Sequence, residues 1–218
     1  GGTGEPIQTF THIVYIGQQI GDFFGFKVID IDESGKWIYE GVDGNPVAYD
    51  DFGHTFEEKK VLGNGLPKYY AGWNNNFRYK NFDLSVTMRG AFAYQILNFQ
   101  RMYLENPTLQ NYNRLASSED LAFGKATVSV PLEFNSYYIE DGDHWKIDNI
   151  TLGYTFNTGN HKFFRTARVY ASSLNTFVIT GYKGIDPEVN RLGLSPGNDD
   201  RDKYPTTRTF TFGVNVSF

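Results

Sequence analysis

The last residues of the chain alternate strictly between apolar and polar side chains, and this pattern restricts the fold more than any other feature. The polar phase consists of Thr, Gly, Asn and Ser. Such period-2 alternation indicates a β-strand with two unlike faces. A strand of about thirteen residues is roughly 44 Å long, which is enough to cross a hydrocarbon layer of about 30 Å when tilted. The apolar phase contains Phe210, Phe212, Val214, Val216 and Phe218.

The same alternation recurs upstream in four further segments. A short turn at Tyr79–Phe82 separates the first two of them. The apolar phase slips by one residue near Asp148–Asn149 and again near Ser172–Ser173, which predicts two β-bulges. Two less regular strands are expected at about 7–16 and 21–31, so the sequence predicts six to seven strands. The four segments span about 69–79, 82–96, 145–156 and 166–180.

The connections between these strands alternate in length. The connections at 79–82 and 157–165 are short. The segments at about 32–66, 98–144 and 181–205 are long and rich in Gly, Pro, Asn and Asp. Short periplasmic turns and long extracellular loops are typical of an outer-membrane barrel. The best candidate for a helix is Leu109–Leu115.

Composition excludes several classes of function. The 218 residues include no Cys and carry a net charge of −5, so neither thiolate chemistry nor a broad basic surface for nucleic acid is expected. No apolar run is long enough for a transmembrane helix. We find no catalytic triad, carboxylate pair or phosphate-binding glycine loop, and therefore expect a protein that is not an enzyme.

The composition of the polar phase separates a membrane barrel from a soluble β-sandwich. The outer face of a sandwich is usually rich in Lys and Glu, whereas this phase holds mainly Thr, Ser, Asn and Gly. That composition suits a wet or plug-filled lumen, and aromatic residues near the strand ends suit the membrane interfaces. We therefore predict an all-β fold in which residues 1–218 form the C-terminal strands of a large antiparallel transmembrane β-barrel. A soluble β-sandwich that binds carbohydrate or acts as an adhesin remains the alternative.

Six stretches, in this order, resemble the C-terminal portion of the SusC/RagA-like TonB-dependent transporters of Bacteroidetes. They cover most of the chain from about residue 20 onward. The stretches are 61–73 (VLGNGLPKYYAGW), 75–85 (NNFRYKNFDLS), 143–154 (DHWKIDNITLGY), 173–180 (SLNTFVIT), 182–189 (YKGIDPEV) and 204–214 (YPTTRTFTFGV).

The resemblance implies a 22-stranded outer-membrane barrel with an N-terminal plug, of which this chain lacks the plug and the first strands. It also implies a SusD-like surface lipoprotein as a lid, and import of glycans, or in some members peptides, with energy delivered through TonB. The expected partners are therefore this lipoprotein, TonB acting on the missing N-terminal part, membrane lipid and the substrate.

Candidate site residues are few. Trp37, Tyr137, Tyr138 and Tyr182 lie in or near the predicted extracellular loops, where exposed aromatic rings can stack on sugars. Packing among the loops is the alternative reading of these rings. Phe218 resembles the terminal aromatic residue that the barrel-assembly machinery reads.

No cofactor is expected. The four His residues are scattered, and the stretch 41–51 lacks the ligand spacing of a calcium loop. The acidic loop Asp199–Asp202 could bind Ca²⁺ through oxygen ligands, but a solvated loop is the better interpretation.

Overall fold

The computed structural model describes residues 6–109, 113–157, 165–189, 193–201 and 203–217. The chain forms two compact units, each made of discontinuous segments. One unit comprises residues 1–67, 93–142 and 182–203, and is called the small-sheet unit here. The other comprises residues 68–92, 143–181 and 204–218, and is called the long-strand unit.

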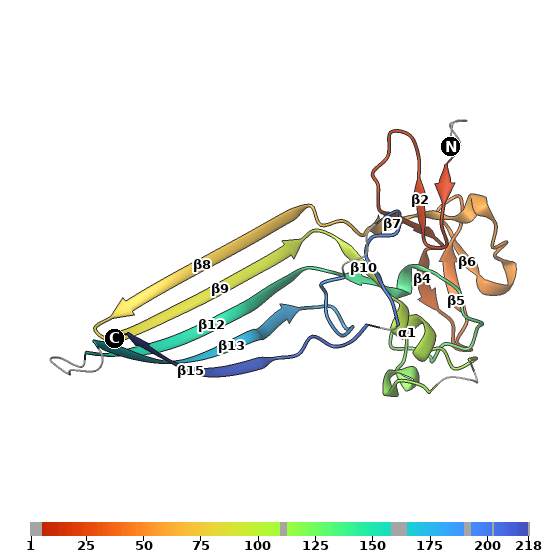
Figure 1. The fold of residues 1–218 in the computed structure, drawn as a ribbon. Helices are drawn as coiled ribbons and strands as arrows, with labels where there is room; N and C mark the ends of the chain where they lie inside the picture. The colour runs from red at the N-terminus through yellow and green to blue at the C-terminus, as the bar shows by residue number, and fades with distance from the viewer. Residues whose placement is uncertain (1–5, 110–112, 158–164, 190–192, 202, 218) are drawn as a thin grey trace. The chain divides into compact units, whose positions relative to one another are not determined.

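The long-strand unit is a five-stranded antiparallel sheet in which each strand lies beside its neighbour in the sequence (Figure 1). The first two strands form a hairpin whose turn contains Lys80 in a left-handed conformation, with φ of 53°. The hairpin and the predicted alternating segments are thus confirmed, except that the segment predicted at 82–96 ends at Phe92. The strands are β8 (Tyr69–Tyr79), β9 (Phe82–Phe92), β12 (His144–Asn157), β13 (Thr166–Thr180) and β15 (Thr209–Ser217).

Both predicted irregularities in these strands are present. The register shifts between Ile147 and Asn149 where β12 pairs with β9 and with β13, which confirms the first slip. On β13 the shift lies a few residues beyond the predicted position, around Asn175, whose φ is 49°. The shifts keep the apolar residues of both strands on one face despite the extra residues.

The small-sheet unit corrects the prediction of long structureless loops. The segments 93–142 and 182–203, which connect β9 to β12 and β13 to β15, fold into one compact unit with residues 1–67, and residues of 1–67 and 93–142 share its hydrophobic core. Trp37, Tyr39 and Phe23 are fully buried in that core. The strands expected at about 7–16 and 21–31 are also not part of the long sheet. They break into short strands of this unit, so the long sheet has five strands and not six or seven.

Three small sheets make up this unit. The first contains β1 (Ile7–Gln8), β2 (His12–Val14), β3 (Asp22–Gly25) and β7 (Lys60–Asn64). The second contains β4 (Val28–Ile31), β5 (Trp37–Glu40) and β6 (Pro46–Ala48). The third contains β10 (Gln95–Asn98), β11 (Ile139–Asp141) and β14 (Asn198–Asp199). Among the described residues of this unit, short 3₁₀ helices lie at Tyr49–Asp51, Phe56–Glu58, Ala116–Glu119 and Ser136–Tyr138.

The α-helix of the described residues, α1 (Phe99–Leu104), lies before the predicted segment Leu109–Leu115. The side chain of Asn98 caps it by accepting a hydrogen bond from the backbone nitrogen of Arg101. Residues 110–112 of the predicted helix lie outside the described residues. Across the described residues, no helix is long and apolar enough to span a membrane.

Candidate functional site

One face of the five-stranded sheet is mainly apolar on every strand, with Asn75 and Ser173 as polar exceptions. The register places Phe82, Tyr154, Val169 and Val214 in one row across β9, β12, β13 and β15. Their neighbours in the next row are also apolar, with Leu152 opposite Ala171. The large side chains of β15 on this face are 44% to 82% exposed. Because the core face of a soluble sandwich is buried, this exposure fits a sheet that faces lipid.

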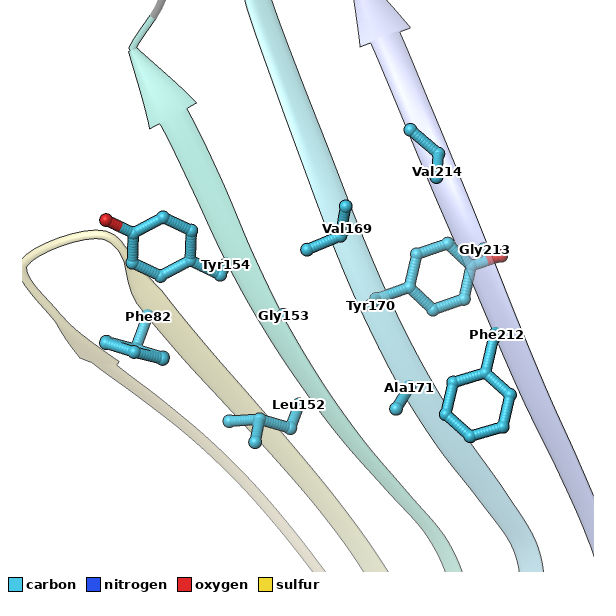
Figure 2. Close-up of a pocket in the computed structure, with 10 residues that line it drawn as sticks. All are labelled: Phe82, Leu152, Gly153, Tyr154, Val169, Tyr170, Ala171, Phe212, Gly213 and Val214. Atoms are coloured by element: carbon cyan, nitrogen blue, oxygen red, sulfur yellow. The ribbon is translucent and has the colours of Figure 1, made fainter.

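A groove of about 590 Å³ crosses this apolar face (Figure 2). Side chains of β12 and β15 flank it, and Val169 and Ala171 of β13 lie between them. Phe82 and Tyr154 form one end: the centroid of Tyr154 lies 4.7 Å from that of Phe82, and 4.7 Å from that of Phe156 outside the groove, both in edge-on contacts. Such contacts hold the rings in place.

The opposite face carries hydroxyl, amide and paired charged groups. Arg168 on β13 donates to Asp83 on β9 through Nε at 2.9 Å and Nη2 at 2.5 Å. Its guanidinium crosses β12 over Gly153, where a Cβ atom would come within 2.6 Å of it. A second ion pair joins Arg89 to Asp148 at 2.7 Å. The charges of these four groups are therefore compensated within the sheet.

Hydroxyl and amide groups form a further network on this polar face. The hydroxyl of Thr151 lies 2.9 Å from that of Ser172, and both donate to the side-chain oxygen of Asn149. The network joins β12 to β13. A polar face of this kind can remain hydrated, as a water-filled lumen requires.

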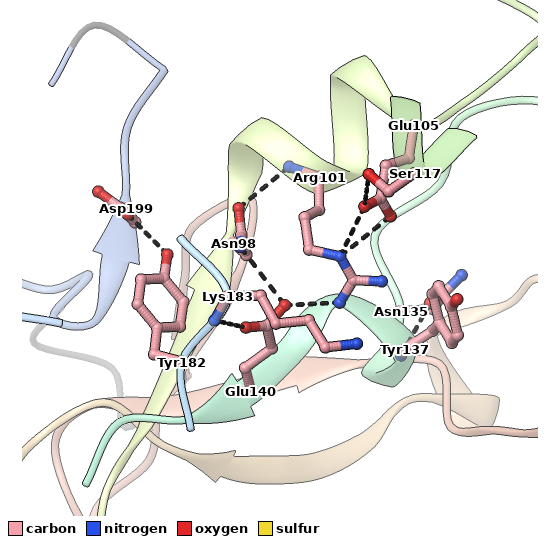
Figure 3. Close-up of polar contacts among 10 residues, drawn as sticks. All are labelled: Asn98, Arg101, Glu105, Ser117, Asn135, Tyr137, Glu140, Tyr182, Lys183 and Asp199. Atoms are coloured by element: carbon pink, nitrogen blue, oxygen red, sulfur yellow. Dashed lines mark hydrogen bonds and ion pairs between the residues drawn. The ribbon is translucent and has the colours of Figure 1, made fainter. Parts of the chain in front are cut away.

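A buried ion cluster connects separate segments of the small-sheet unit (Figure 3). Arg101 on α1 donates from Nε to Glu105 at 2.9 Å and from Nη1 to Glu140 at 2.5 Å. The other carboxylate oxygen of Glu140 accepts the backbone N–H of Lys183 at 2.8 Å. Burial works against the charge of Arg101, but the hydrogen bonds to both carboxylates outweigh burial and raise its pKa. The cluster ties the connection 182–203 to α1 and β11.

A second buried contact holds the same connection. The hydroxyl of Tyr182 donates to Oδ2 of Asp199 at 2.6 Å. Burial raises the pKa of Asp199, although the hydrogen bond from Tyr182 and the nearby Lys203 act in the opposite direction. Burial also raises the pKa of Tyr182, as does its bond to Asp199. β14, which contains Asp199, pairs with β10 in parallel.

Three of the four aromatic residues proposed for sugar binding are not exposed. Trp37 and Tyr138 are each 1% exposed, and Tyr182 is 6% exposed. Tyr137 is half-buried, with its ring 4.9 Å from Trp37, and the Arg101 guanidinium lies 5.2 Å from it. The expectation of open rings is wrong for Trp37, Tyr138 and Tyr182, because the loops that contain them fold into a core. A role of these residues in substrate binding stays an untested prediction.

The calcium prediction at Asp199–Asp202 also stays untested. Asp199 is buried and bonded to Tyr182, whereas Asp200 is exposed and Asp202 lies outside the described residues. In the part of the chain that the structure describes, no three His, Cys, Asp or Glu side chains gather as a metal site. Phe218, the predicted assembly signal, lies outside the described residues.

The sequence did not predict the ion pairs of the polar face or the buried ion cluster around Arg101. Arg101 and Glu105 have the i, i+4 spacing of a helical ion pair, so this half of the buried cluster had a readable signal. The other half did not, because Glu140 lies 39 residues from Arg101.

Comparisons with known proteins agree with this geometry. No family model matches the chain. The chain is 27% identical over 252 residues to the TonB-dependent receptor P3 of Formosa agariphila, which covers 99% of the chain and 24% of that receptor. It is 29% identical over 210 residues to the TonB-dependent receptor SusC of Bacteroides thetaiotaomicron, which covers 93% of the chain and 20% of SusC. The chain thus spans less than a quarter of the length of these relatives.

Solved structures show the same fold. A structure described as the RagAB peptide transporter matches with a TM-score of 0.78 and 21% identity, over 97% of this chain and 24% of that chain. The RagAB peptide importer in its closed-closed state matches with a TM-score of 0.77 and 20% identity, over the same shares of both chains.

The two-faced sheet and these relatives point to one class: the chain is similar over nearly its whole length to part of the TonB-dependent receptors, which are outer-membrane proteins. Within that class it is SusC/RagA-like, as the six sequence stretches predicted.

Proposed function

We propose that this segment forms part of the barrel wall of an importer that takes nutrients across the outer membrane. The observation that carries the proposal is the five-stranded sheet with one exposed apolar face and one polar face of compensated charge. In a membrane barrel the apolar face contacts lipid and the polar face lines the interior. TonB would supply the energy through the N-terminal part of the complete receptor. The segment itself would act as a wall and not as an enzyme.

The proposed partner is a SusD-like surface lipoprotein that closes the extracellular side. The likeness to SusC and to the RagAB structures supports it. The connections 93–142 and 182–203 leave the ends of the strands opposite the short turn. Because the short turns of outer-membrane barrels are periplasmic, these connections would be extracellular. The small-sheet unit would then form part of the surface that meets the lid.

The proposed substrate class is glycans, with peptides as the second candidate. The resemblance to the SusC/RagA-like transporters supports glycans. The RagAB structures, which are described as a peptide importer, support peptides. A soluble carbohydrate-binding sandwich fits less well, because the apolar side chains of β15 are exposed and would be buried in a sandwich.

The test is purification of the complete receptor from outer membranes in detergent, followed by identification of the co-purified proteins and measurement of uptake. We expect a much larger species that retains a lipoprotein, together with growth on a glycan that is lost when the receptor is deleted. Growth defects on peptides alone would replace glycans with peptides as the substrate. A detergent-free, monodisperse species of the size of this chain would overturn the proposal.

A further inference from the structure

We propose that the groove over β12 and β13 binds one acyl chain of a phospholipid, whose phosphate lies beside Lys80. The inference rests on the proposed position of the apolar face in the membrane, and goes beyond it by assigning a lipid site to particular residues.

The shape of the groove follows from one small side chain between two large ones. The register places Ala171 directly between Leu152 on β12 and Phe212 on β15. A single methyl group next to a leucine and a phenylalanine leaves a depression, which the next row continues through Val169. The groove volume of about 590 Å³ lies within the range of about 300–1,000 Å³ typical of small-molecule sites.

Contacts with neighbouring side chains fix the residues that form the walls of the groove. Tyr154 is braced edge-on between Phe82 and Phe156, so the aromatic end resists collapse onto the floor. Phe212 on the opposite side is 82% exposed and projects from the sheet. The depression is therefore built into the sheet and is filled from outside.

The chemistry of the lining selects an aliphatic occupant. Hydrocarbon side chains of Leu152, Val169, Ala171 and Phe212 face the groove. The polar side chains of the lining are Tyr154 and Tyr170 alone, so a sugar or peptide in this place would lose most of its hydrogen bonds to water without replacement, at a cost of about 1–3 kcal/mol for each polar group. The groove is also continuous with the lipid-facing surface, so an acyl chain reaches it directly from the bilayer.

A cation lies at the turn end of the same hairpin. Lys80 is two residues from Phe82, and its Nζ lies 5.3 Å from the centroid of the Tyr79 ring. A lysine over an aromatic ring at a strand end is typical of the membrane–water interface. Its positive charge complements a phosphate group. Because the short turn is the periplasmic end, the site would lie in the inner leaflet of the outer membrane.

The test uses native mass spectrometry of the complete receptor, delipidated in detergent and titrated with phosphatidylglycerol. Ala171→Phe fills the floor of the groove. Ala71→Phe is the matched control, because Ala71 on β8 lies on the same apolar face but outside the groove lining. We expect Ala171→Phe to weaken the tightest lipid-binding step about tenfold, because contact with about two methylene groups is lost, while Ala71→Phe leaves that step unchanged. Lys80→Gln should weaken the binding of phosphatidylglycerol without affecting the binding of a neutral diacylglycerol.

Equal lipid binding by wild type and both alanine variants would overturn the site. So would a change in the subunit number of the receptor on Ala171→Phe, which would show that another protein chain occupies the groove. If the receptor inserts into membranes and transports normally but shows no lipid-binding step, this inference is contradicted and the proposed function is not. A receptor that fails to enter membranes at all would instead contradict the proposed function.

Discussion

Arg168 on β13 reaches Asp83 on β9 by crossing β12 directly over Gly153. In the register, Gly153 lies opposite Asp83 on one side and Tyr170 on the other, so it occupies the path of the guanidinium. Any side chain at position 153 would fill this path. The ion pair therefore depends on the absence of a Cβ on the strand between its two members.

Gly153→Ala should break or lengthen this ion pair. The added Cβ would lie 2.3 Å from the Nη2 atom of Arg168, and the guanidinium would have to move away. We expect a loss of about 1–2 kcal/mol in stability, typical of a partly exposed charged hydrogen bond. The measurement is the guanidinium-induced unfolding midpoint of the complete receptor in lipid vesicles.

Gly72→Ala is the control for that substitution. Gly72 lies on β8 on the same polar face, and a Cβ there would meet no heavy atom within 4 Å. A Gly-to-Ala change without strain stabilises by about 0.4–1 kcal/mol through the unfolded chain. The two variants should therefore shift the midpoint in opposite directions. A parallel shift of both would show that the Arg168–Asp83 pair contributes nothing measurable.

The long strands could be predicted because their alternation persists over 9 to 15 residues. Over that length the period identifies both the strand and its apolar side. The small-sheet unit offers no such signal. Its strands are two to five residues long, and all four residues of Asp22–Gly25 are buried, so no alternation exists there. Its glycine- and proline-rich composition therefore predicts loops where the structure has short strands.

The candidate site was less predictable than the fold. Arg168 and Asp83 are 85 residues apart, and their pairing depends on the register of three strands. The burial of Trp37 and Tyr182 likewise depends on contacts between distant segments. An aromatic residue in a predicted loop looks the same in sequence whether it is exposed or in a core.

Glu140→Ala should destabilise the small-sheet unit more than Glu105→Ala. Either substitution leaves Arg101 with one carboxylate, but Glu140 also accepts the backbone N–H of Lys183 and so joins two distant segments. Because Arg101 keeps Glu105 in the Glu140→Ala variant, we expect a loss below the about 3–5 kcal/mol that a fully unpaired buried charge costs. Hydrogen exchange of the complete receptor measures the effect at residues 97–105 and 182–183. Equal protection in both variants would contradict the assigned role of Glu140.

Asp199→Asn should remove a pH-dependent loss of stability. Burial raises the pKa of Asp199 above its ordinary value of 3.8, so the folded chain retains a proton that the unfolded chain has released. The associated stability is complete below that value and declines as pH rises through the folded pKa. Tyr182, Lys203 and Asp186 face this carboxyl group and contribute to its titration.

Asparagine can still accept the hydrogen bond from Tyr182, but it does not ionise. The variant should therefore gain protection relative to wild type as pH rises above the ordinary carboxyl range of about 4. The measurement is amide exchange at β14, with wild type and variant compared at each pH. Identical pH profiles would rule out Asp199 as the titrating group.

Phe212→Lys and Thr211→Lys place the same charge on opposite faces of β15. Phe212 is 82% exposed on the apolar face, whereas Thr211 lies opposite Ser172 on the polar face. A lysine near the membrane midplane costs about 2–4 kcal/mol, and a residue facing the lumen remains hydrated. We expect Phe212→Lys to reduce the amount of folded receptor in outer membranes, measured by heat-modifiable mobility on gels, and Thr211→Lys to retain it. If the polar-face variant were the defective one, the lipid-facing side of the sheet would have been assigned to the wrong face.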